Sequence, residues 1–289
     1  ELVQDKGPFL LVDGHRGFGH IIAEQAMALA IDRAHSSHFA VLSLRNSFHL
    51  GRLGDWGTMA AEAGFICILY ANVQSSRPLV APFGGSDARF VTNPYCTAIP
   101  ATEKHPMFVL DMATSTIAMG KARVAQLSGK PAPEGALIDA QGAPTRDPSV
   151  LFDGAGGALT AFGQHKGFGL ALLGDILGGS FSGGGAYAPT REVPDRIVNN
   201  MMAILIDPNV FGLAESFGVD VDSYTDWVKA SPAAPDTSGV QFPGDPERRS
   251  TAERLANGIP LDAGTLAQLS EAARKAGVPE AAHLSSTPD

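Results

Sequence analysis

The chain has little cysteine: Cys67 and Cys96 are the two cysteines among 289 residues. Two cysteines give no disulfide framework, and Cys67 lies inside an apolar run (residues 65–69), where we expect a core thiol. Charged residues are also few, at 18%, whereas hydrophobic residues reach 44%. This balance is typical of a globular protein, and the length allows one large or two modest domains with a hydrophobic core.

Positive charge is scarcer than negative charge. The 21 Lys and Arg residues against 30 Asp and Glu residues give a net charge of −9. An acidic chain is a poor candidate for nonspecific binding to nucleic acid. The chain also lacks an uninterrupted apolar run long enough to span a membrane. We therefore expect a cytoplasmic protein whose partner is a small molecule, with neither nucleic acid nor membrane among its partners.

Two familiar ligand motifs are missing. Glycines 14, 17 and 19 precede a predicted helix as Gly-x-x-Gly-x-Gly, which is not the Rossmann spacing Gly-x-Gly-x-x-Gly, and Asp32 lies inside that helix. We assign these glycines to turn geometry. His35 and His38 flank two serines, but no cluster of residues shows metal-ligand spacing with carboxylates or thiols. We expect no metal site.

Short apolar runs alternate with helical patterns along the chain, as in α/β proteins. We predict strands at residues 9–12, 39–44, 65–70, 107–110 and 201–206. We predict helices at residues 18–33, 53–63, 115–127, 166–177, part of 210–229, 245–257 and 263–276. Residues 72–106 are rich in Pro, Gly, Ser and Asn and are predicted to form a long loop, and loops of that length are usually functional.

The most informative stretch is residues 45–51, Arg-Asn-Ser-Phe-His-Leu-Gly, which follows a predicted strand. Strand ends are where α/β enzymes present reactive side chains, and histidine can exchange a proton near neutral pH. His49 is therefore a candidate acid/base, and the alternative is a turn histidine bonded to a backbone carbonyl. A nucleophilic pair of Ser47 and His49 is not supported, because the Gly-x-Ser-x-Gly elbow is absent. Arg45 can clamp a substrate carboxylate or form a structural ion pair, and we favour the ion pair.

Three further motifs follow along the chain: Pro-Phe-Gly-Gly at 82–85 with Thr-Asn-Pro at 92–94, Leu-Asp-Met-Ala-Thr-Ser at 110–115, and Lys-Gly-Phe-Gly-Leu at 166–170. Each is weak alone. Together with residues 45–51, in this order and at this spacing, they resemble the type 2 malate/L-lactate dehydrogenase family of NAD(P)-dependent oxidoreductases. The chain departs from the family pattern at Phe48, Leu50 and Val91.

The resemblance implies an α/β, non-Rossmann NAD(P)-binding fold with a mixed sheet, a central cofactor domain and flanking helices. Residues 73–199 would form the central NAD(P)-binding domain. Residues 1–72 and 200–289 would form a helix-rich part for substrate binding and dimerisation. Family members usually carry further N-terminal helices with an arginine for the substrate carboxylate, which we do not find in this chain. We expect efficient turnover to need them.

The resemblance also implies roles for single residues. His49 would be the acid/base, and Ser47 would support its position or the substrate. Asp111 would either cap the following helix or orient His49. Lys166 would hold a cofactor phosphate or ribose at a helix start that offers free N–H groups, the alternative being a solvated lysine. The cofactor contacts would be Asn72, Val73, Asp111, Met112, Ala113, Lys166, Pro243, Gly244 and Asp245.

The expected activity is hydride transfer between the nicotinamide of NAD or NADP and C2 of a small 2-hydroxy or 2-keto acid, carried out by a homodimer. One alternative within the family is an NADPH-dependent reductase of cyclic imino acids (ketimines). An alternative from another class is a noncatalytic nucleotide-binding protein. The sequence does not choose between NAD and NADP.

Overall fold

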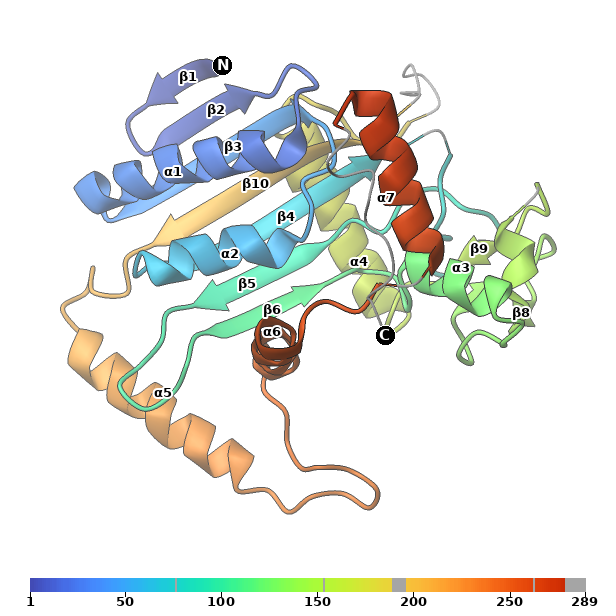
Figure 1. Cartoon of the computed structure of the whole chain (residues 1–289). Helices are drawn as coiled ribbons and strands as arrows, with labels where there is room; N and C mark the ends of the chain where they lie inside the picture. Colours follow the sequence, from blue (N-terminus) through green and yellow to red (C-terminus); the bar gives the residue numbers. More distant parts are fainter. Residues whose placement is uncertain (76, 153, 189–195, 262, 279–289) are drawn as a thin grey trace. The chain divides into compact units, whose positions relative to one another are not determined.

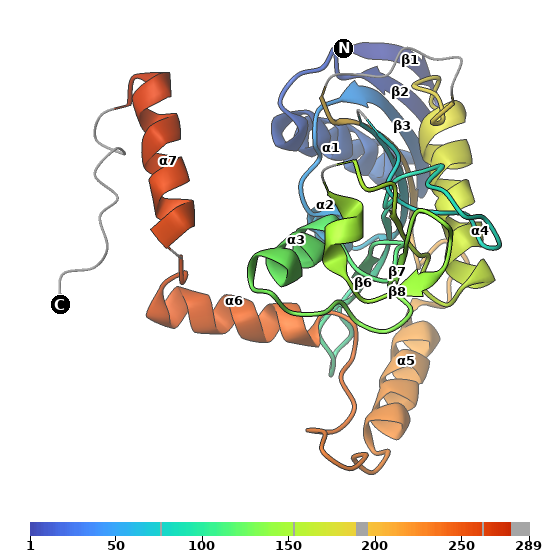
Figure 2. The ribbon, with the colours of Figure 1, turned by 90° about the vertical axis from the view of Figure 1, so that its right-hand side faces the viewer.

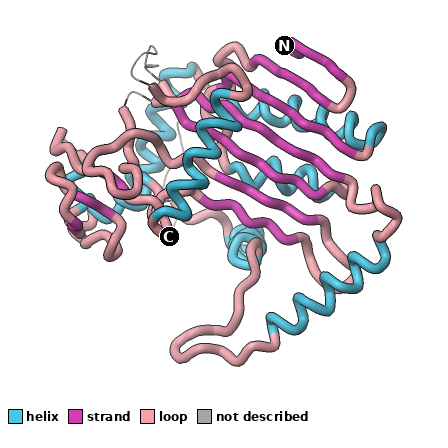
Figure 3. Tube along the Cα trace, turned by 180° about the vertical axis from the view of Figure 1, so that it is seen from behind, coloured by secondary structure: helices cyan, strands magenta, loops and turns pink. Residues whose placement is uncertain are grey.

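The computed structural model describes residues 1–75, 77–152, 154–188, 196–261 and 263–278. The chain divides into two compact units, Glu1–Pro243 and Gly244–Asp289. The first unit contains all the strands and the helices that surround them (Figures 1 and 3). Within the residues described, no helix is long and apolar enough to cross a membrane.

A seven-stranded mixed sheet with the order β1-β2-β3-β10-β4-β5-β6 forms the centre of the first unit (Figure 1). β2 and β3 are parallel, whereas β10 runs antiparallel to both β3 and β4. β2, β3, β4 and β6 therefore point in one direction, and their carboxyl ends share one edge of the sheet. This mixed α/β sheet confirms the predicted fold class. The strands are β1 (Leu2–Lys6), β2 (Phe9–Asp13), β3 (Phe39–Ser47), β4 (Ile66–Gln74), β5 (Tyr95–Ile99), β6 (Phe108–Met112) and β10 (Val198–Ile206).

Helices cover both faces of this sheet. α1 (Gly19–Ser37) and α2 (Leu53–Glu62) lie on one face, and α4 (His165–Leu173) continues into the π-helix η2 (Gly174–Ser180) on the other (Figures 1 and 2). The buried face of α1 consists mainly of small residues spaced three or four apart, and these allow the helix to lie close to the sheet. Those residues are Ala23, Ala26, Met27, Ala30 and Ala34.

A smaller three-stranded sheet with the order β8-β7-β9 has its own core. It contains β7 (Leu137–Ile138), β8 (Pro144–Thr145) and β9 (Ala158–Leu159), beside α3 (Met119–Leu127) and the 3-10 helix η1 (Pro148–Leu151). The segment 73–199 thus supplies β5 and β6 to the large sheet and the whole of the small sheet. Its assignment as the cofactor domain stays a prediction.

The predicted loop at residues 72–106 is wrong in part, because β4 extends to Gln74 and β5 lies within the segment. Because proline and glycine are frequent in the segment around Tyr95–Ile99, the sequence pattern did not predict this short strand, in which Cys96 and Ala98 are buried. The helix predicted from residue 115 begins only at Met119, since Ser115 pairs with Ala161 as an isolated β-bridge. Long-range pairing therefore overrides the local pattern at both places.

The C-terminal helices agree with the sequence prediction. α5 (Ala214–Lys229) belongs to the first unit, where His105 of the β5–β6 connection bonds Asp226 at 2.9 Å. The second unit contains α6 (Asp245–Asn257) and α7 (Ala263–Ala276). Both cysteines are buried free thiols in neighbouring strands, which confirms the core thiol expected at Cys67, and burial raises the pKa of Cys96 to about 12.

Candidate active site

The carboxyl ends of β2, β3, β4 and β6 lie at the same sheet edge as the start of β10. Ligands of α/β proteins bind beyond such an edge. The structure brings His49, Asn72 and Asp111 to it, since each lies within three residues of a strand end. One expectation is corrected here: the polar residues Arg45 to Ser47 lie inside β3, because the strand extends to Ser47.

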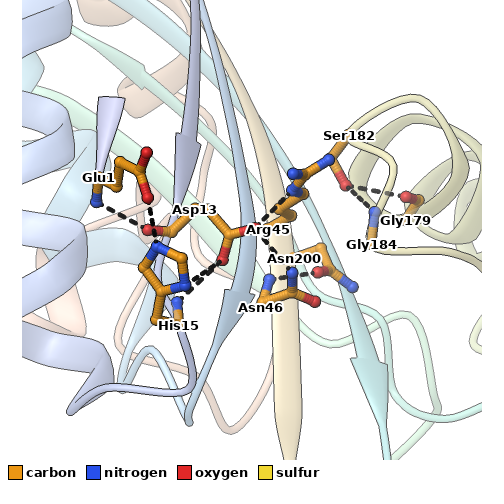
Figure 4. Close-up of polar contacts among 9 residues, drawn as sticks. All are labelled: Glu1, Asp13, His15, Arg45, Asn46, Gly179, Ser182, Gly184 and Asn200. Atoms are coloured by element: carbon orange, nitrogen blue, oxygen red, sulfur yellow. Dashed lines mark hydrogen bonds and ion pairs between the residues drawn. The ribbon is translucent and has the colours of Figure 1, made fainter. Parts of the chain in front are cut away.

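Asp13 at the end of β2 anchors the β3 side of this edge (Figure 4). Its carboxylate accepts hydrogen bonds from Arg45 Nε at 2.7 Å, Asn46 Nδ2 at 3.0 Å and the His15 amide at 2.9 Å. Burial acts to raise the pKa of Asp13, but the bonds from His15, Arg45 and Asn46 hold it below its ordinary value. Arg45 therefore has the structural ion pair that the sequence analysis favoured.

Two asparagines of β10 bond the end of β3 and the loop after it, and Figure 4 shows one of them, Asn200. Asn200 Oδ1 accepts from the Asn46 amide at 2.8 Å, and Asn199 Oδ1 accepts from the Leu50 amide at 3.0 Å. The indole of Trp56 donates to the Leu50 carbonyl at 3.1 Å. The sequence analysis missed both asparagines, because it placed the start of this strand at Met201. The available signal was a pair of amides at the head of an apolar strand.

His49 is exposed, and its ring is oriented by the chain that follows it. The Gly51 amide donates to His49 Nδ1 at 2.9 Å. A ring nitrogen that accepts carries no proton, so neutral His49 has its hydrogen on Nε2. The side chain keeps contact with solvent, but neighbouring atoms cover part of it, and this partial desolvation and, secondarily, the charge of His20 lower the pKa of His49. Among the residues that the structure describes, the ring bonds this backbone amide and not a backbone carbonyl, and Nε2 has no hydrogen-bond partner.

Ser47 lies two residues before His49 and is fully buried. Among the residues that the structure describes, its Oγ has no hydrogen-bond partner, and the same holds for Ser43 Oγ in the same strand. Buried hydroxyls are usually bonded, so these two are exceptions. Of these two serines, Ser47 lies at the end of β3, two residues before His49.

Asp111 lies within β6, and its carboxylate bonds the start of α2, the helix that follows the His49 loop. Its Oδ2 accepts from the Gly54 amide at 2.9 Å and lies 3.4 Å from Arg52 Nε. The carboxylate therefore caps the first turn of α2. The expectation that Asp111 caps the following helix, α3, is wrong. Its partner is the Gly54 amide of α2, which comes close to Asp111 only because folding brings the two segments together. Arg52 also pairs with Asp55 at 2.9 Å, so this guanidinium is neutralised.

The turn after β6 runs alongside the segment that leads into α4. The Thr116 amide donates to the Thr160 carbonyl at 2.8 Å, and the Phe162 amide donates to the Thr114 carbonyl at 3.1 Å. This antiparallel pairing joins the residues just after Ala113 to the segment that ends a few residues before Lys166. The structure thus brings together two of the predicted cofactor segments that lie far apart in the sequence.

Lys166 is exposed and is the second residue of α4. Two of the amides at this helix start are already bonded, which leaves fewer free N–H groups than expected. The Lys166 amide donates to the Gly163 carbonyl at 3.2 Å, and the Gly167 amide donates to the Phe162 carbonyl at 3.0 Å. A phosphate contact here rests on the lysine ammonium, because the preceding turn already satisfies these amides.

Asn72 is buried in a network that joins β4, β10 and η2. Its Nδ2 donates to the Gly185 carbonyl at 2.8 Å and to Asp175 at 3.2 Å, and its Oδ1 accepts from Asn200 at 2.8 Å. Burial raises the pKa of Asp175. The neighbouring Val73 amide donates to Asn93 Oδ1 at 3.1 Å. These bonds give Asn72 a structural role. Its contact with a cofactor stays a prediction, as does that of Val73.

The last predicted contacts lie where the two units meet in sequence. The Pro243 carbonyl accepts from the Val109 amide of β6 at 3.3 Å, which holds Pro243 beside the sheet. Gly244, Asp245 and Arg248 belong to the second unit. Gly244 has a φ of 96°, and Asp245 begins α6 and pairs with Arg248. Across the described residues there is no group of three His, Cys, Asp or Glu side chains that could hold a metal ion.

The fold and the histidine at its sheet edge define an α/β enzyme, and comparison with known proteins gives its family. Residues 1–270 match the Malate/L-lactate dehydrogenase family. Hydroxycarboxylate dehydrogenase B of Escherichia coli (strain K12) is 43% identical over 280 residues, which cover 96% of this chain and 76% of that protein. The L-lactate dehydrogenase of Cupriavidus necator is 40% identical over 251 residues, covering 87% and 72% of the two chains.

A solved structure supports the same relationship. The malate dehydrogenase of Pyrococcus horikoshii OT3 superposes with a TM-score of 0.80 at 32% identity, covering 96% of this chain and 77% of that one. The chain belongs to the malate/L-lactate dehydrogenase family and is an oxidoreductase. The family resemblance inferred from four short motifs is confirmed.

Proposed function

We propose that this dehydrogenase interconverts a small 2-hydroxy acid and its 2-keto acid, with His49 as the acid/base. Family membership makes the protein an oxidoreductase of the CH–OH group that uses a nicotinamide cofactor. The cofactor, when bound, supplies or accepts the hydride. The observation that carries the proposal is the exposed His49 at the carboxyl edge of the sheet, with Nδ1 fixed by Gly51 and Nε2 left for a substrate oxygen.

The proton step follows from this geometry. During oxidation, His49 can take the hydroxyl proton on Nε2 only once its ring hydrogen is on Nδ1, so the bond from the Gly51 amide to Nδ1 must open first. The C2 hydrogen then leaves with its electron pair. During reduction, protonated His49 returns that proton to the ketone oxygen. Ser47 adds a buried hydroxyl beside this loop that supports His49 or the substrate.

The described residues fit a dinucleotide. The exposed Lys166 ammonium offers a charge-assisted bond to a phosphate or ribose oxygen, and the turn at Met112 and Ala113 runs beside the segment that carries it. Residues 73–199 are then the central cofactor-binding part. The further contacts we propose within the first unit are Asn72, Val73, Asp111 and Pro243. NAD and NADP are both candidates.

The two alternative activities receive less support. The curated relatives named above, at 40% identity or more, are dehydrogenases of hydroxy acids. A cyclic imino acid reductase would need less help from an acid/base residue, because its substrate is already protonated. A noncatalytic nucleotide-binding protein gives no reason for an oriented, exposed histidine at the sheet edge.

We also propose a homodimer located in the cytoplasm. α5 exposes Val219, Tyr224 and Trp227, which are large apolar side chains of the kind that subunit contacts bury. Light scattering should give twice the chain mass of 30.1 kDa. Trp227→Glu should shift the mass to that of one chain if α5 forms the contact.

The activity is tested with a panel of hydroxy, keto and imino acids assayed with NAD(H) and NADP(H). Oxidation of a 2-hydroxy acid is expected to exceed any imino acid turnover. His49→Ala should lower turnover by roughly two to four orders of magnitude, with NAD(P)H affinity unchanged. His35→Ala is the matched control, because His35 is an exposed histidine whose ring contacts Phe65 instead. Near-normal turnover of His49→Ala would remove His49 from the mechanism.

A further inference from the structure

One of the short sequence motifs, Thr-Asn-Pro at residues 92–94, has no role in the reaction proposed above. Its asparagine, Asn93, is completely buried in the segment between β4 and β5. A buried amide side chain needs partners for an acceptor oxygen and for a nitrogen with two hydrogens. The bonds of Asn93 therefore show which parts of the molecule this motif connects.

The Asn93 side chain joins the end of β4 to the helices on one face of the sheet. Its Oδ1 accepts from the Val73 amide at 3.1 Å. Its Nδ2 donates to the Ala171 carbonyl in α4 at 3.0 Å and to Asp175 Oδ2 in η2 at 2.8 Å. Gly174 allows this close approach, since a Cβ atom added to it would lie 2.9 Å from the Asn93 Cβ. All the bonding groups of the amide are thus used, on three different elements.

The backbone of the same motif holds the turn after β6. The fully buried hydroxyl of Thr114 donates to the Thr92 carbonyl at 3.0 Å and to the Asn93 carbonyl at 3.1 Å. The Thr114 amide also donates to the Thr92 carbonyl, at 3.0 Å. Thr114 directly follows the turn at residues 112–113, which contains two of the proposed cofactor contacts. Residues 92–93 therefore connect that turn with the end of β4.

We propose that Asn93 is a positioning residue for the cofactor: it fixes the end of β4 and the turn after β6, so that Val73 and residues 112–113 contact the same dinucleotide. Asn93 has no exposed surface, so it acts through these segments and does not touch the cofactor itself. Segments that are already ordered lose less conformational entropy when a ligand binds, which favours binding. The effect on affinity rests on the proposed cofactor contacts, whereas the bonds of Asn93 do not.

Three substitutions test the two connections. Asn93→Ala removes the whole side chain. Asn93→Asp keeps an oxygen for the Val73 amide but loses both donated bonds and places a second carboxyl group beside Asp175. It also provides a second variant if Asn93→Ala does not fold. Thr114→Val keeps the shape of the side chain and removes only the hydroxyl bonds to the carbonyls of residues 92–93.

The control is Asp222→Ala. Asp222 is also buried, but it bonds Thr102 in the β5–β6 connection, which lies at the opposite edge of the sheet from the candidate site. This variant should lose stability without disturbing the segments that Asn93 holds. It therefore separates a general loss of stability from a local loss of order.

Hydrogen exchange without cofactor measures whether Asn93 holds these segments. In Asn93→Ala, the backbone amides of Val73, of residues 114–116 and of α4 should exchange faster, whereas those of α1 should not change. A purely structural role would speed exchange in α1 as well, through global unfolding. Unchanged exchange at Val73 and at residues 114–116 would overturn the proposal.

Titration of NAD(P)H fluorescence gives the second readout. Asn93→Ala and Asn93→Asp should weaken binding by about tenfold, Thr114→Val should weaken it less, and Asp222→Ala should leave it unchanged. Asn93→Ala removes no charge, so the salt dependence of binding should stay as in the unsubstituted protein, unlike that of Lys166→Ala. The KM for the cofactor should rise while kcat at saturation changes little, because β10 still holds the segment around His49.

The outcomes distinguish this proposal from the proposed function. If exchange and affinity change as expected but no 2-hydroxy acid is oxidised by the unsubstituted protein, the positioning role stands and the proposed function fails. If Asn93→Ala binds NAD(P)H as tightly as Asp222→Ala does, the positioning role fails and the proposed function is unaffected.

Discussion

The loop that presents His49 and the turn that presents Lys166 are held in different ways. Side chains of another strand fix the segment around His49: Asn200 of β10 bonds Asn46 at the end of β3, and Asn199 bonds Leu50 in the loop. At the Lys166 turn, the Lys166 and Gly167 amides instead bond backbone carbonyls within five residues of themselves. One region is thus fixed by the tertiary structure and the other by its own local turn.

The difference matches what each region is proposed to do. Proton transfer requires donor and acceptor within hydrogen-bond distance and well aligned, so a small displacement costs rate. The attraction between an ammonium and a phosphate falls off gradually with distance, so it tolerates movement. Buried asparagine side chains therefore hold the segment around His49, whereas an exposed lysine at a helix start can bind a phosphate without such support.

The largest expected loss of stability comes from replacing an asparagine that holds the segment around His49. Asn200→Ala would leave the Asn46 amide and Asn72 Oδ1 buried without partners. Each unsatisfied group costs about 1–3 kcal/mol, so the free energy of unfolding should fall by about 2–6 kcal/mol. Turnover should fall as well, because the His49 loop loses its anchor. Urea unfolding measures the first effect.

The control for this change is Asn209→Ala, which removes an exposed asparagine bonded to Asp207. It should lower the free energy of unfolding by less than about 1 kcal/mol. Equal urea midpoints for the two variants would show that the amide network does not fix the loop.

Lys166→Ala tests the locally held region. Loss of one charge-assisted bond of about 1.5–3 kcal/mol should weaken cofactor binding by roughly tenfold to a hundredfold. At saturating cofactor, kcat should change little, because the His49 loop is untouched. Titration of NAD(P)H fluorescence at low and high salt measures the effect, and Lys130→Ala is the control. Identical titration curves for both variants would return Lys166 to the role of a solvated turn residue.

The pH dependence of hydroxy acid oxidation sharpens the comparison further. Burial and the charge of His20 hold the pKa of His49 below the ordinary 6.5. Oxidation needs neutral His49, and the neutral fraction is lost as the pH falls through this pKa. The acid limb of kcat/KM should therefore have its midpoint below pH 6.5 and should be absent in His49→Ala. A midpoint above that value would contradict the proposed state of His49.

The smallest effect on stability is expected from Ser47→Ala. Its Oγ and that of Ser43 are buried without partners in the described residues, so removing either hydroxyl breaks no hydrogen bond there. Both variants should change the free energy of unfolding by less than about 1 kcal/mol. If Ser47 supports His49 or the substrate, Ser47→Ala alone should lower turnover, by about tenfold. Equal turnover in the two variants would remove Ser47 from the site.

The sequence predicted those parts of the molecule that depend on local pattern. Apolar runs and turn residues indicated most of the large strands and helices, and four short motifs indicated the family and His49. The bond that holds the end of β3 near His49 was not predictable, because Asn46 and Asn200 are 154 positions apart in the chain. The α2 cap by Asp111 was missed for the same reason. At Lys166, the bonds that satisfy the helix amides depend on a tight turn that composition does not reveal.

The most direct test of the account is a single turnover with the cofactor already bound. NAD(P)H at saturating concentration is mixed with a 2-keto acid, and its oxidation is followed by stopped flow in the unsubstituted protein, His49→Ala and Lys166→Ala. The account predicts that the rate in His49→Ala falls by roughly two to four orders of magnitude, whereas Lys166→Ala at the same occupancy reacts nearly as fast as the unsubstituted protein. An undiminished rate in His49→Ala would contradict the claim that the fixed loop carries the proton transfer.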